Sequence, residues 1–477
     1  MELHVVIEGD KDLAGQLYRQ LKDAIRAGRL SAGEKLPPSR LLAEQLGLSR
    51  KTVSEAYARL SFDRLLTARV GSGTFVAEGA ARGPAPAAAR SLAGSAMVEH
   101  WRGMNMPLRH PAPAGSARYE YIGGAPARDL FPHADWRRCV LHALRQGTRS
   151  RGLYGDAEGL HELRDGIARH VSFSRGVRCG AADILVTNGA QQALDLIARV
   201  LVEPGSTVAM EEPGYPPARQ LLGAQGARVV GVPVDREGLV VERIPDGTRL
   251  IYVTPAHQFP LGVEMSERRR KALLARADEL GAIVIEDDYD SEFRYEGRPA
   301  DSLQSMDERG LVAFVGTFSK TLSPDLRLGY LVAPPAVLEA VGTAKHLTDW
   351  HTSTQAQWAL AKFIADGNLH RHIRRCHAVY AARRERIVRR FADDLSPWFE
   401  LLPVTAGIHM AAVCRREIDI GQLVALARRV DVGLYPLAPF FHFSPPRPGL
   451  MLGFGAIDEA DIDPSLDRVR DVLLQMG

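Results

Sequence analysis

Three helical patterns occupy the first part of the chain. In the first segment, apolar residues at every fourth position share one helix face, namely Leu13, Leu17, Leu21 and Ile25. A second helix is predicted to start after two prolines, with Ser39 as its N-cap, and to end at Gly47. Ser49 is expected to cap a third helix, whose apolar stripe has helical spacing at Val53, Ala56, Tyr57 and Leu60.

A glycine-rich turn follows these helices. Residues 65–70 and 74–76 have the composition of short strands, and Gly71, Ser72 and Gly73 between them supply a turn. Two paired strands after three short helices have the form of a wing. The sequence therefore predicts an α+β winged helix-turn-helix domain over residues 1–78.

The remainder of the chain follows a different pattern. Residues 79–116 are rich in Ala, Pro, Gly and Arg without a sustained period, which predicts a linker. Further on, amphipathic helical stretches alternate with short apolar runs at residues 184–186, 250–253, 282–285 and 311–315. This alternation predicts a mostly parallel sheet covered by helices. We expect a multidomain protein with an α/β domain over residues 117–477, divided into a large part (117–343) and a smaller C-terminal part (344–477).

Charge is distributed unevenly between these two domains. The net charge of the whole chain is +3, which by itself predicts no particular partner. Between Leu13 and Phe75, however, eleven Lys and Arg stand against five Asp and Glu, an excess of about +6. A basic small domain beside a near-neutral large one favours nucleic-acid binding at the N-terminal end.

The cysteines and the apolar runs narrow the protein class further. The four cysteines lie far apart and form no CxxC pair, which argues against a metal ribbon or a disulfide scaffold: they are Cys139, Cys179, Cys376 and Cys414. We expect no metal site. Since no signal pattern follows Met1 and no apolar run approaches membrane-spanning length, the expected compartment is the cytoplasm, with no membrane partner.

The third predicted helix has the chemistry of a DNA-recognition helix. Polar and basic residues open it, namely Arg50, Lys51 and Thr52, and the apolar stripe lies behind them. Each charge taken alone is equally consistent with a solvated basic helix. The order of motifs is more specific, because it combines LPPSR (36–40), LGLSRKTV (46–53), AY (56–57) and GSGTFV (71–76).

Over about 65 residues these motifs resemble the GntR-type winged helix. The resemblance implies that Arg40, Arg50, Lys51 and Thr52 contact phosphates and base edges of double-stranded operator DNA, and that Gly71 lets the wing approach the minor groove closely. The full set of expected DNA-binding residues is Ser39, Arg40, Arg50, Lys51, Thr52, Gly71, Ser72 and Gly73.

A second set of residues has the chemistry that pyridoxal phosphate (PLP) requires. Lys320 follows the strand predicted at 311–315 and can bond an aldehyde, while Asp287 and Tyr289 follow the strand at 282–285 and can hold a ring nitrogen and a phenolic oxygen. Taken singly, Lys320 is more simply a surface charge. The acidic run at 286–290 could equally be a metal site or a helix cap.

Other residues suit the phosphate and the ring of PLP. The loop Thr187–Gln191 precedes a predicted helix, whose N-terminus would attract a phosphate, and Arg327 offers a guanidinium partner. Tyr215, in the run EPGYP, offers an aromatic ring to stack on the pyridine, although it could also be a buried core tyrosine.

Together these runs resemble the fold type I aminotransferases, and their fusion to the winged helix resembles the MocR subfamily of GntR regulators. The likeness covers nearly the whole chain and rests on YGDAEG (154–159), NGAQQAL (188–194), EPGY (212–215), TPAHQFP (254–260), EDDYDSEFRY (286–295) and GTFSK (316–320).

The resemblance assigns roles to these residues. It implies that Lys320 forms a Schiff base with PLP, that Asp287 pairs with the ring nitrogen and that Tyr289 contacts the phenolic oxygen. The remaining cofactor residues that it implies are Gly189, Ala190, Gln191, Ser319 and Arg327 around the phosphate, Tyr215 on the ring, and Tyr154 toward the phosphate of a partner subunit.

Two departures from the transaminase pattern bear on activity. Residues 259–262 read FPLG where transaminases carry NPxG, so the usual asparagine contact is absent unless Gln258 replaces it. Met451 stands where transaminases usually place the arginine that binds a substrate carboxylate. Arg219 and Arg447 are the candidates to replace that arginine in effector binding.

These features predict a PLP-dependent transcription regulator that senses a small amine, an amino acid or PLP itself and controls operator binding. The alternative is a working aminotransferase with a DNA-binding tether, and the missing tail arginine counts against it. The family pattern further implies a head-to-tail, domain-swapped homodimer.

Overall fold

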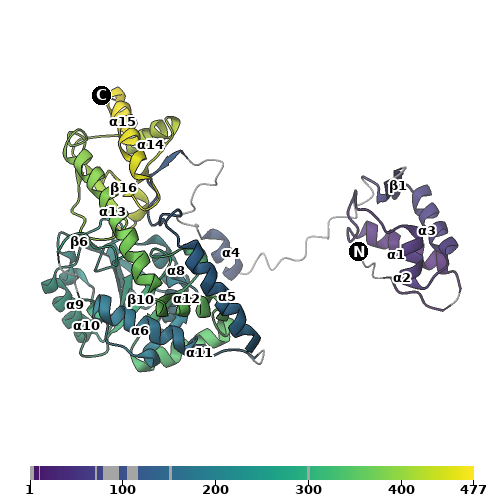
Figure 1. The fold of residues 1–477 in the computed structure, drawn as a ribbon, viewed down its shortest axis with the longest axis horizontal. Coiled ribbons are helices and arrows are strands. Elements are labelled where there is room, and N and C mark those ends of the chain that lie inside the picture. Colours follow the sequence, from purple (N-terminus) through teal and green to yellow (C-terminus); the bar gives the residue numbers. More distant parts are fainter. Residues whose placement is uncertain are drawn as a thin grey trace. The chain divides into compact units, whose positions relative to one another are not determined.

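A computed structural model of the 477-residue chain describes residues 5–9, 11–69, 72–78, 96–104, 117–149, 153–297 and 301–476. The chain forms two compact units, Met1–Met104 and Asn105–Gly477. Figure 1 shows the elements of both units, and each unit is considered by itself below.

The first unit contains the predicted winged helix. Its elements are α1 (Leu13–Arg26), α2 (Ser39–Leu46), α3 (Arg50–Phe62), β1 (Leu66–Arg69) and β2 (Gly73–Val76). The apolar stripes predicted from the sequence converge on one core, in which Leu17, Ile25, Val53 and Leu60 are completely buried. Strands β1 and β2 pair antiparallel from Leu66 opposite Val76 to Arg69 opposite Gly73.

The ends of these helices test the capping predictions. Ser49 caps α3, since its Oγ accepts a hydrogen bond from the Thr52 backbone N–H at 3.1 Å, and Gly47 ends α2 with a φ of 65°. The prediction for Ser39 is wrong. Ser39 is the first residue of α2, and Pro38, which has no side-chain donor or acceptor, occupies the cap position.

A helix lies inside the segment predicted as a linker. Helix α4 (Ala96–Gly103) has an i,i+3 ion pair between Glu99 and Arg102 at 2.8 Å. The other residues of 79–116 lie outside the described part of the chain, apart from Met104.

The second unit is built on an eight-stranded sheet in the order β4-β11-β10-β9-β8-β5-β6-β7. The strands are β4 (Ile184–Thr187), β5 (Thr207–Glu212), β6 (Arg228–Asp235), β7 (Gly238–Leu239), β8 (Thr248–Val253), β9 (Ile283–Asp288), β10 (Val312–Thr317) and β11 (Gly329–Val332). Neighbouring strands from β10 through β6 pair parallel, while β11 and β7 run antiparallel to their neighbours. The predicted mostly parallel sheet is confirmed.

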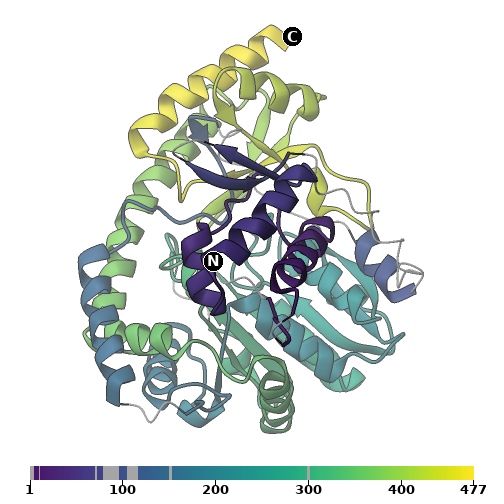
Figure 2. The same cartoon turned by 90° about the vertical axis from the view of Figure 1, so that its right-hand side faces the viewer.

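Helices cover both faces of this sheet (Figures 1 and 2). Adjacent strand residues point to opposite faces, so Leu185 packs with one helix layer and Ile184 and Val186 with the other. The first layer contains α7 (Ala190–Leu201), α8 (Pro216–Ala224) and α11 (Pro335–Asp349). The second contains α5 (His133–Arg149), α6 (His161–Arg175), α9 (Glu267–Leu280), α10 (Leu303–Met306) and α12 (Thr354–Ala365).

The C-terminal part forms a second core. Its four-stranded sheet has the order β12-β13-β16-β15, with β12 (Phe399–Leu401), β13 (His409–Cys414), β15 (Tyr435–Pro436) and β16 (Gly449–Gly453). The helices of this part are α13 (Asn368–Ala392), α14 (Ile420–Arg429) and α15 (Glu459–Met476). A short parallel pair joins β3 (Tyr119–Glu120) to β14 (Val432–Gly433).

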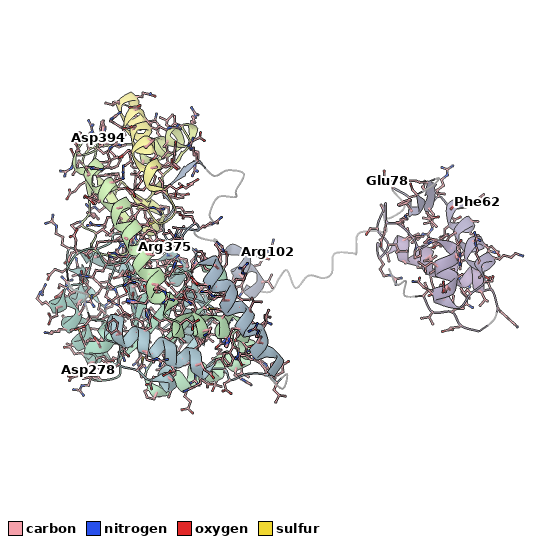
Figure 3. All side chains as sticks on the ribbon, in the orientation of Figure 1. Phe62, Glu78, Arg102, Asp278, Arg375 and Asp394 are labelled. Carbon is pink, nitrogen blue, oxygen red and sulfur yellow. The ribbon has the colours of Figure 1, made fainter. Side chains whose placement is uncertain are left out.

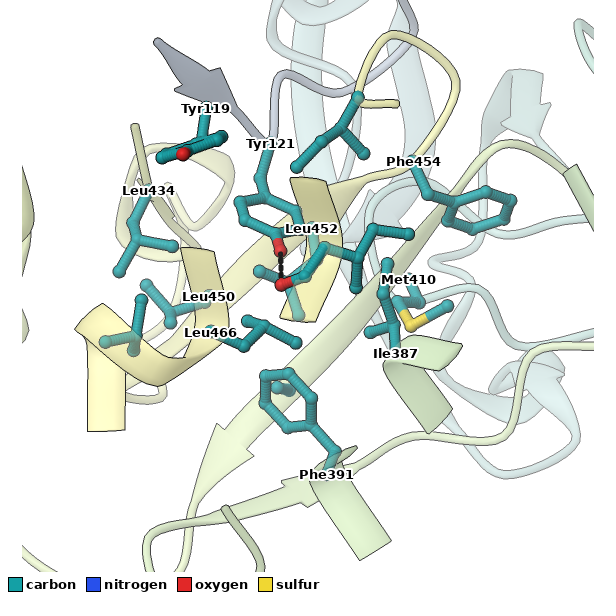
Figure 4. Packing of buried hydrophobic residues seen from close by; sticks show 14 of the residues in the cluster. Tyr119, Tyr121, Ile387, Phe391, Met410, Leu434, Leu450, Leu452, Phe454 and Leu466 are labelled. Atoms are coloured by element: carbon teal, nitrogen blue, oxygen red, sulfur yellow. Dashed lines mark hydrogen bonds between the residues drawn. The ribbon is translucent and has the colours of Figure 1, made fainter. Parts of the chain in front are cut away.

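Figure 4 shows this second core, where Tyr121 lies among Leu452, Phe454 and Leu466. The Tyr121 hydroxyl is bonded to Ser465 Oγ at 2.7 Å, so its polar end is satisfied within an apolar cluster. The chain just after the linker is thus packed against residues from the last hundred positions.

Among the helices that the structure describes, α13 is the longest, at 25 residues, and it carries many arginines. Within the described part of the chain, no helix combines the length and the apolar character needed to cross a membrane. The predicted boundary between residues 343 and 344 falls inside helix α11.

Candidate functional site

A cavity of about 470 Å³ lies at the carboxyl ends of the parallel strands. Asp287 comes from the end of β9, and Thr317 ends β10 just before Lys320. Ala190 and Tyr215 stand where α7 and α8 begin, after β4 and β5. Open α/β sheets bind ligands at this edge, because the strand ends and the helix N-termini meet there. Asp287 is part of the strand, not beyond it as the sequence pattern suggested.

Lys320 lies in this cavity with its amine oriented by the backbone. Its Nζ donates a 2.6 Å hydrogen bond to the Gly124 carbonyl, and glycine leaves room there because a Cβ on Gly124 would lie 2.8 Å from Nζ. Burial lowers the pKa of Lys320, as does the positive charge of Arg327, while Asp290 and Asp287 act in the opposite direction. A lysine with a lowered pKa is a better nucleophile toward an aldehyde.

Asp287 provides a test of whether the cavity suits PLP. Its Oδ2 accepts a 2.7 Å hydrogen bond from the Tyr252 hydroxyl, but its buried Oδ1 has no partner among the described residues. Burial raises the pKa of Asp287 to about 6. An unpaired buried carboxylate oxygen needs a donor, and the protonated ring nitrogen of PLP is such a donor. The site therefore fits the cofactor at the position predicted for Asp287.

The residues predicted to hold the phosphate, here called the phosphate cradle, lie at or next to the cavity. Gly189, with a φ of 81°, is the N-cap of helix α7, and the next two residues, Ala190 and Gln191, line the cavity. The Arg327 guanidinium donates to the Asn188 carbonyl at 2.8 Å, and Arg327 itself has a φ of 49°, a strained conformation for a non-glycine residue. Ser319 also lines the cavity. A helix N-terminus and a guanidinium together attract a phosphate.

Two tyrosines of the predicted set also line the cavity. The Tyr215 ring lies 5.4 Å from that of Phe259 in an edge-to-face contact, and burial raises the pKa of Tyr215 to about 12. The Tyr289 hydroxyl donates to the His257 carbonyl at 2.8 Å. Its oxygen also lies 3.1 Å from His257 Nδ1.

Three other predicted residues do not contribute to the lining of the cavity. Tyr154 is exposed, with its ring 4.1 Å from that of Trp350. Arg219 is half-buried in α8, and Arg447 is exposed in the loop before β16. Met451, by contrast, is 6% exposed and does line the cavity.

The structure adds residues to which the sequence assigned no role. Tyr252 supports Asp287, and its signal was a tyrosine inside the apolar run 250–253, whose hydroxyl needs a partner when buried. Asp290 pairs with His257 Nδ1 at 2.9 Å and lies 3.9 Å from His409 Nδ1. Burial and the neighbouring His257 lower the pKa of His409 to about 3, so it is uncharged at neutral pH.

No metal site was expected, yet His257, Asp290 and His409 bring potential ligand atoms within 4.8 Å of one another. Asp290 already accepts hydrogen bonds from His257 and from the Ile408 backbone N–H at 3.0 Å. This network joins the loop after β8 to strand β13, and its member His409 lines the cavity.

Most of the described residues that were predicted to bind DNA are exposed on the winged helix. Arg40, Arg50 and Lys51 are exposed and form no ion pair within the described residues. Thr52 Oγ1 is bonded to Ser49 Oγ at 2.8 Å and is half-buried. Ser39 is half-buried, Ser72 and Gly73 are exposed, and Gly71 lies outside the described residues. At its other end α3 projects Phe62, labelled in Figure 3, into solvent.

Comparison with known protein families matches both units. Residues 13–76 match the family described as bacterial regulatory proteins, gntR family. Residues 132–432 match aminotransferase class I and II. The chain is 36% identical over 477 residues to the probable rhizopine catabolism regulatory protein MocR of Rhizobium meliloti, a match that covers 99% of this chain and 96% of that one. It is 38% identical over 400 residues to the transcriptional regulator TauR of Rhodobacter capsulatus, covering 81% of each.

Solved structures give the same result for the second unit. Kynurenine aminotransferase from Pyrococcus horikoshii superposes with a TM-score of 0.71 at 27% identity and covers 81% of this chain and 99% of that one. The α-aminoadipate aminotransferase LysN from Thermus thermophilus, solved with N-(5'-phosphopyridoxyl)-L-leucine, gives a TM-score of 0.68 at 27% identity, covering 75% and 92%. The large unit therefore has the PLP-dependent fold type I. With a GntR winged helix before this fold and relatives matching along nearly its whole length, the chain belongs to the MocR subfamily of GntR-type transcription regulators.

Proposed function

We propose that this DNA-binding, PLP-dependent regulator senses a primary amine in the cavity at Lys320 and thereby changes its affinity for operator DNA. When bound, PLP supplies an aldehyde carbon that condenses with primary amines. The observation that supports the proposal best is that one cavity contains both the Lys320 amine and Asp287, whose Oδ1 has no hydrogen-bond partner among the described residues.

The residues of the cavity have separate roles in this proposal. Asp287, supported by Tyr252, holds the ring nitrogen, and Tyr289 faces the phenolic oxygen. Tyr215 lies on the ring. Gly189, Ala190, Gln191, Ser319 and Arg327 hold the phosphate. For sensing to control DNA binding, the amine must favour one arrangement of the regulator over another.

Operator binding by the full-length protein tests this function. An operator is first selected from random duplexes, and its affinity is then measured without PLP, with PLP, and with PLP and a panel of amines. A change that requires both PLP and an amine supports amine sensing. A change with PLP alone makes the cofactor the effector, and sustained release of a keto acid shows aminotransferase turnover instead.

We further propose that Arg50 and Lys51 contact the operator. Both are exposed at the N-terminal end of α3, where a recognition helix contacts bases and phosphates. Replacing Arg50 with alanine is expected to weaken operator binding about fivefold or more, because a lost base or phosphate contact costs about 1–3 kcal/mol. Fluorescence anisotropy at several salt concentrations measures both the affinity and the salt slope.

The matched control for this substitution is Arg59→Ala. Arg59 lies on the same helix, is exposed and pairs only with Glu55 at 2.6 Å among the residues described. Operator affinity should stay within about twofold of wild type in this variant, because an exposed i,i+4 pair contributes little. Equal losses for Arg50→Ala and Arg59→Ala would contradict the assignment of α3's N-terminal end as the DNA contact.

We also propose a homodimer, arranged head to tail so that each winged helix meets the large unit of its partner. Its support is the exposed ring contact between Tyr154 and Trp350, together with the exposed Leu153 and Leu347 near them in the sequence, of which Leu347 is 81% exposed. Exposed apolar patches on a protein surface mark interaction sites. In the dimer, Tyr154 would reach the phosphate site of the partner.

Replacing Leu347 with aspartate is expected to shift the protein toward monomer. A charge buried at an interface is strongly unfavourable, whereas on a free surface it is tolerated. Light scattering over a concentration series measures the shift. Leu474→Asp, at an exposed position of α15, is the control. A fully dimeric Leu347→Asp protein would place the interface elsewhere.

A further inference from the structure

Beyond the cofactor residues, the cavity wall is apolar. Phe259 contacts Tyr215 on one side and Phe440 on the other, with ring centroids 5.4 and 5.1 Å apart. Pro217, from the first turn of α8, and Met451, from β16, continue this wall. The part of the cavity left for an effector is therefore lined largely by carbon and sulfur atoms.

Met451 lies close to the point where an amine would arrive. A Cβ on Gly123 would overlap the Met451 methyl, and a Cβ on the next residue, Gly124, would lie 2.8 Å from Lys320 Nζ. Consecutive Cα atoms are about 3.8 Å apart, so the thioether and the reactive amine flank neighbouring backbone positions. A substituent on an amine at Lys320 would meet Met451 within a few atoms.

The charged groups that line the cavity already have other roles or partners. Among the described residues that line it, the Lys and Arg side chains are Lys320 and Arg327, which serve the cofactor's aldehyde and phosphate. His409 also lines the cavity, but its lowered pKa, caused by burial and by His257, leaves it neutral. The Tyr435 hydroxyl donates to Glu120 Oε2 at 2.6 Å. A carboxylate brought here would find no free cation among these described lining residues, and burying an unpaired carboxylate is strongly disfavoured.

We infer that this cavity selects primary amines that carry no carboxylate, such as alkylamines and arylalkylamines, and rejects the corresponding amino acids. The inference rests on the proposed function, since the amine is recognised at the PLP that Lys320 holds. It goes further by naming the chemical class of effector and Met451 as a specificity-determining residue.

Matched pairs of compounds test this selection on the full-length protein loaded with PLP. Phenethylamine is compared with phenylalanine, and propylamine with gamma-aminobutyrate, each pair differing by one carboxylate. The visible absorbance band of the bound cofactor reports binding, and operator affinity provides a second readout. We expect each plain amine to act at concentrations at least about tenfold lower than its carboxylated partner, a difference of about 1.4 kcal/mol.

A new cation in the wall should reverse the preference. Met451→Arg is expected to make phenylalanine or gamma-aminobutyrate act at least about tenfold more readily, since a guanidinium pairs with a carboxylate. If Met451→Arg loses the cofactor band, Pro217→Arg introduces the cation from α8 instead. Gln422→Arg adds the same charge at an exposed position of α14 and should leave the preference unchanged.

The outcomes separate this inference from the proposed function. Equal responses of the wild-type protein to both members of each pair would overturn the inference and leave amine sensing intact. A response of the wild-type protein to the carboxylated amines alone would also overturn the inference and leave amine sensing intact. No response to any amine, with the cofactor band present, would overturn both.

Discussion

Replacing Lys320 with alanine is expected to abolish the visible absorbance band that bound PLP gives in the wild-type protein. The band depends on a covalent bond to an amine, and Lys320 is the lysine that the described structure places in the cavity. PLP can still bind weakly through Asp287 and the phosphate cradle. Absorbance spectroscopy after dialysis against PLP measures the loss, and mass spectrometry after borohydride reduction locates the attachment.

The same variant separates the two units functionally. Operator DNA should still bind to Lys320→Ala, because the winged helix has its own core, but the response to amines should disappear. Lys271→Ala, which removes an exposed lysine paired with Glu267, is the control and should keep both the band and the response. Retention of the full band in Lys320→Ala would place the cofactor linkage at another residue.

Replacing Asp287 with asparagine should have opposite effects on stability and on cofactor binding. Burial raises the pKa of Asp287 to about 6 from an ordinary value of 3.8, so its ionised form destabilises the cofactor-free fold. We expect Asp287→Asn to increase the free energy of unfolding of the cofactor-free protein by about 3 kcal/mol at pH 7, since each pKa unit corresponds to about 1.4 kcal/mol. PLP affinity should fall by at least about tenfold, because the charged partner of the ring nitrogen is lost.

The stabilisation expected from Asp287→Asn depends on pH, and its direction follows from the raised pKa of Asp287. A carboxyl group whose pKa is raised on folding contributes stability below its unfolded pKa, near 4, and loses it as the pH rises through about 6. The stability difference between Asp287→Asn and wild type should therefore be near zero below pH 4, grow between pH 4 and 6, and stay constant above. Chemical denaturation at several pH values, without PLP, measures it.

Tyr252→Phe is the matched variant for Asp287→Asn. It removes the hydroxyl that donates to Asp287 Oδ2 and leaves both carboxylate oxygens without a partner among the described residues. The cofactor-free protein should then lose about 1–3 kcal/mol of stability at neutral pH, the opposite of the asparagine variant. If both variants were less stable than wild type, Asp287 would be a structural residue whose charge the fold needs.

Features that depend on residues close together in the sequence were predicted more accurately than features that depend on contacts between distant parts of the chain. The Ser49 cap and the Gly47 helix end depend on neighbours within four residues, and both were predicted correctly. Ser39 also has a side chain suited to an N-cap, yet helix α2 starts at Ser39 itself, one residue earlier than predicted. The helix therefore has no side-chain hydrogen bond at its cap position. The strands were located by their apolar runs, but their polar last residues were missed because only the surrounding helices bury them.

By itself, the sequence determined the winged helix and the mostly parallel sheet, because each depends on local periodicity. It also predicted candidate residues at the carboxyl edge of that sheet, since functional residues lie at strand ends. Only the tertiary structure decided which side chains share the cavity. It joined Tyr252 to Asp287, brought His409 next to His257 and placed Met451 against Gly123, while it left Arg219 and Arg447 out of the lining. These pairs are separated by 35 to more than 300 positions in the chain, and contacts over such distances depend on how the two cores pack, which no local pattern encodes.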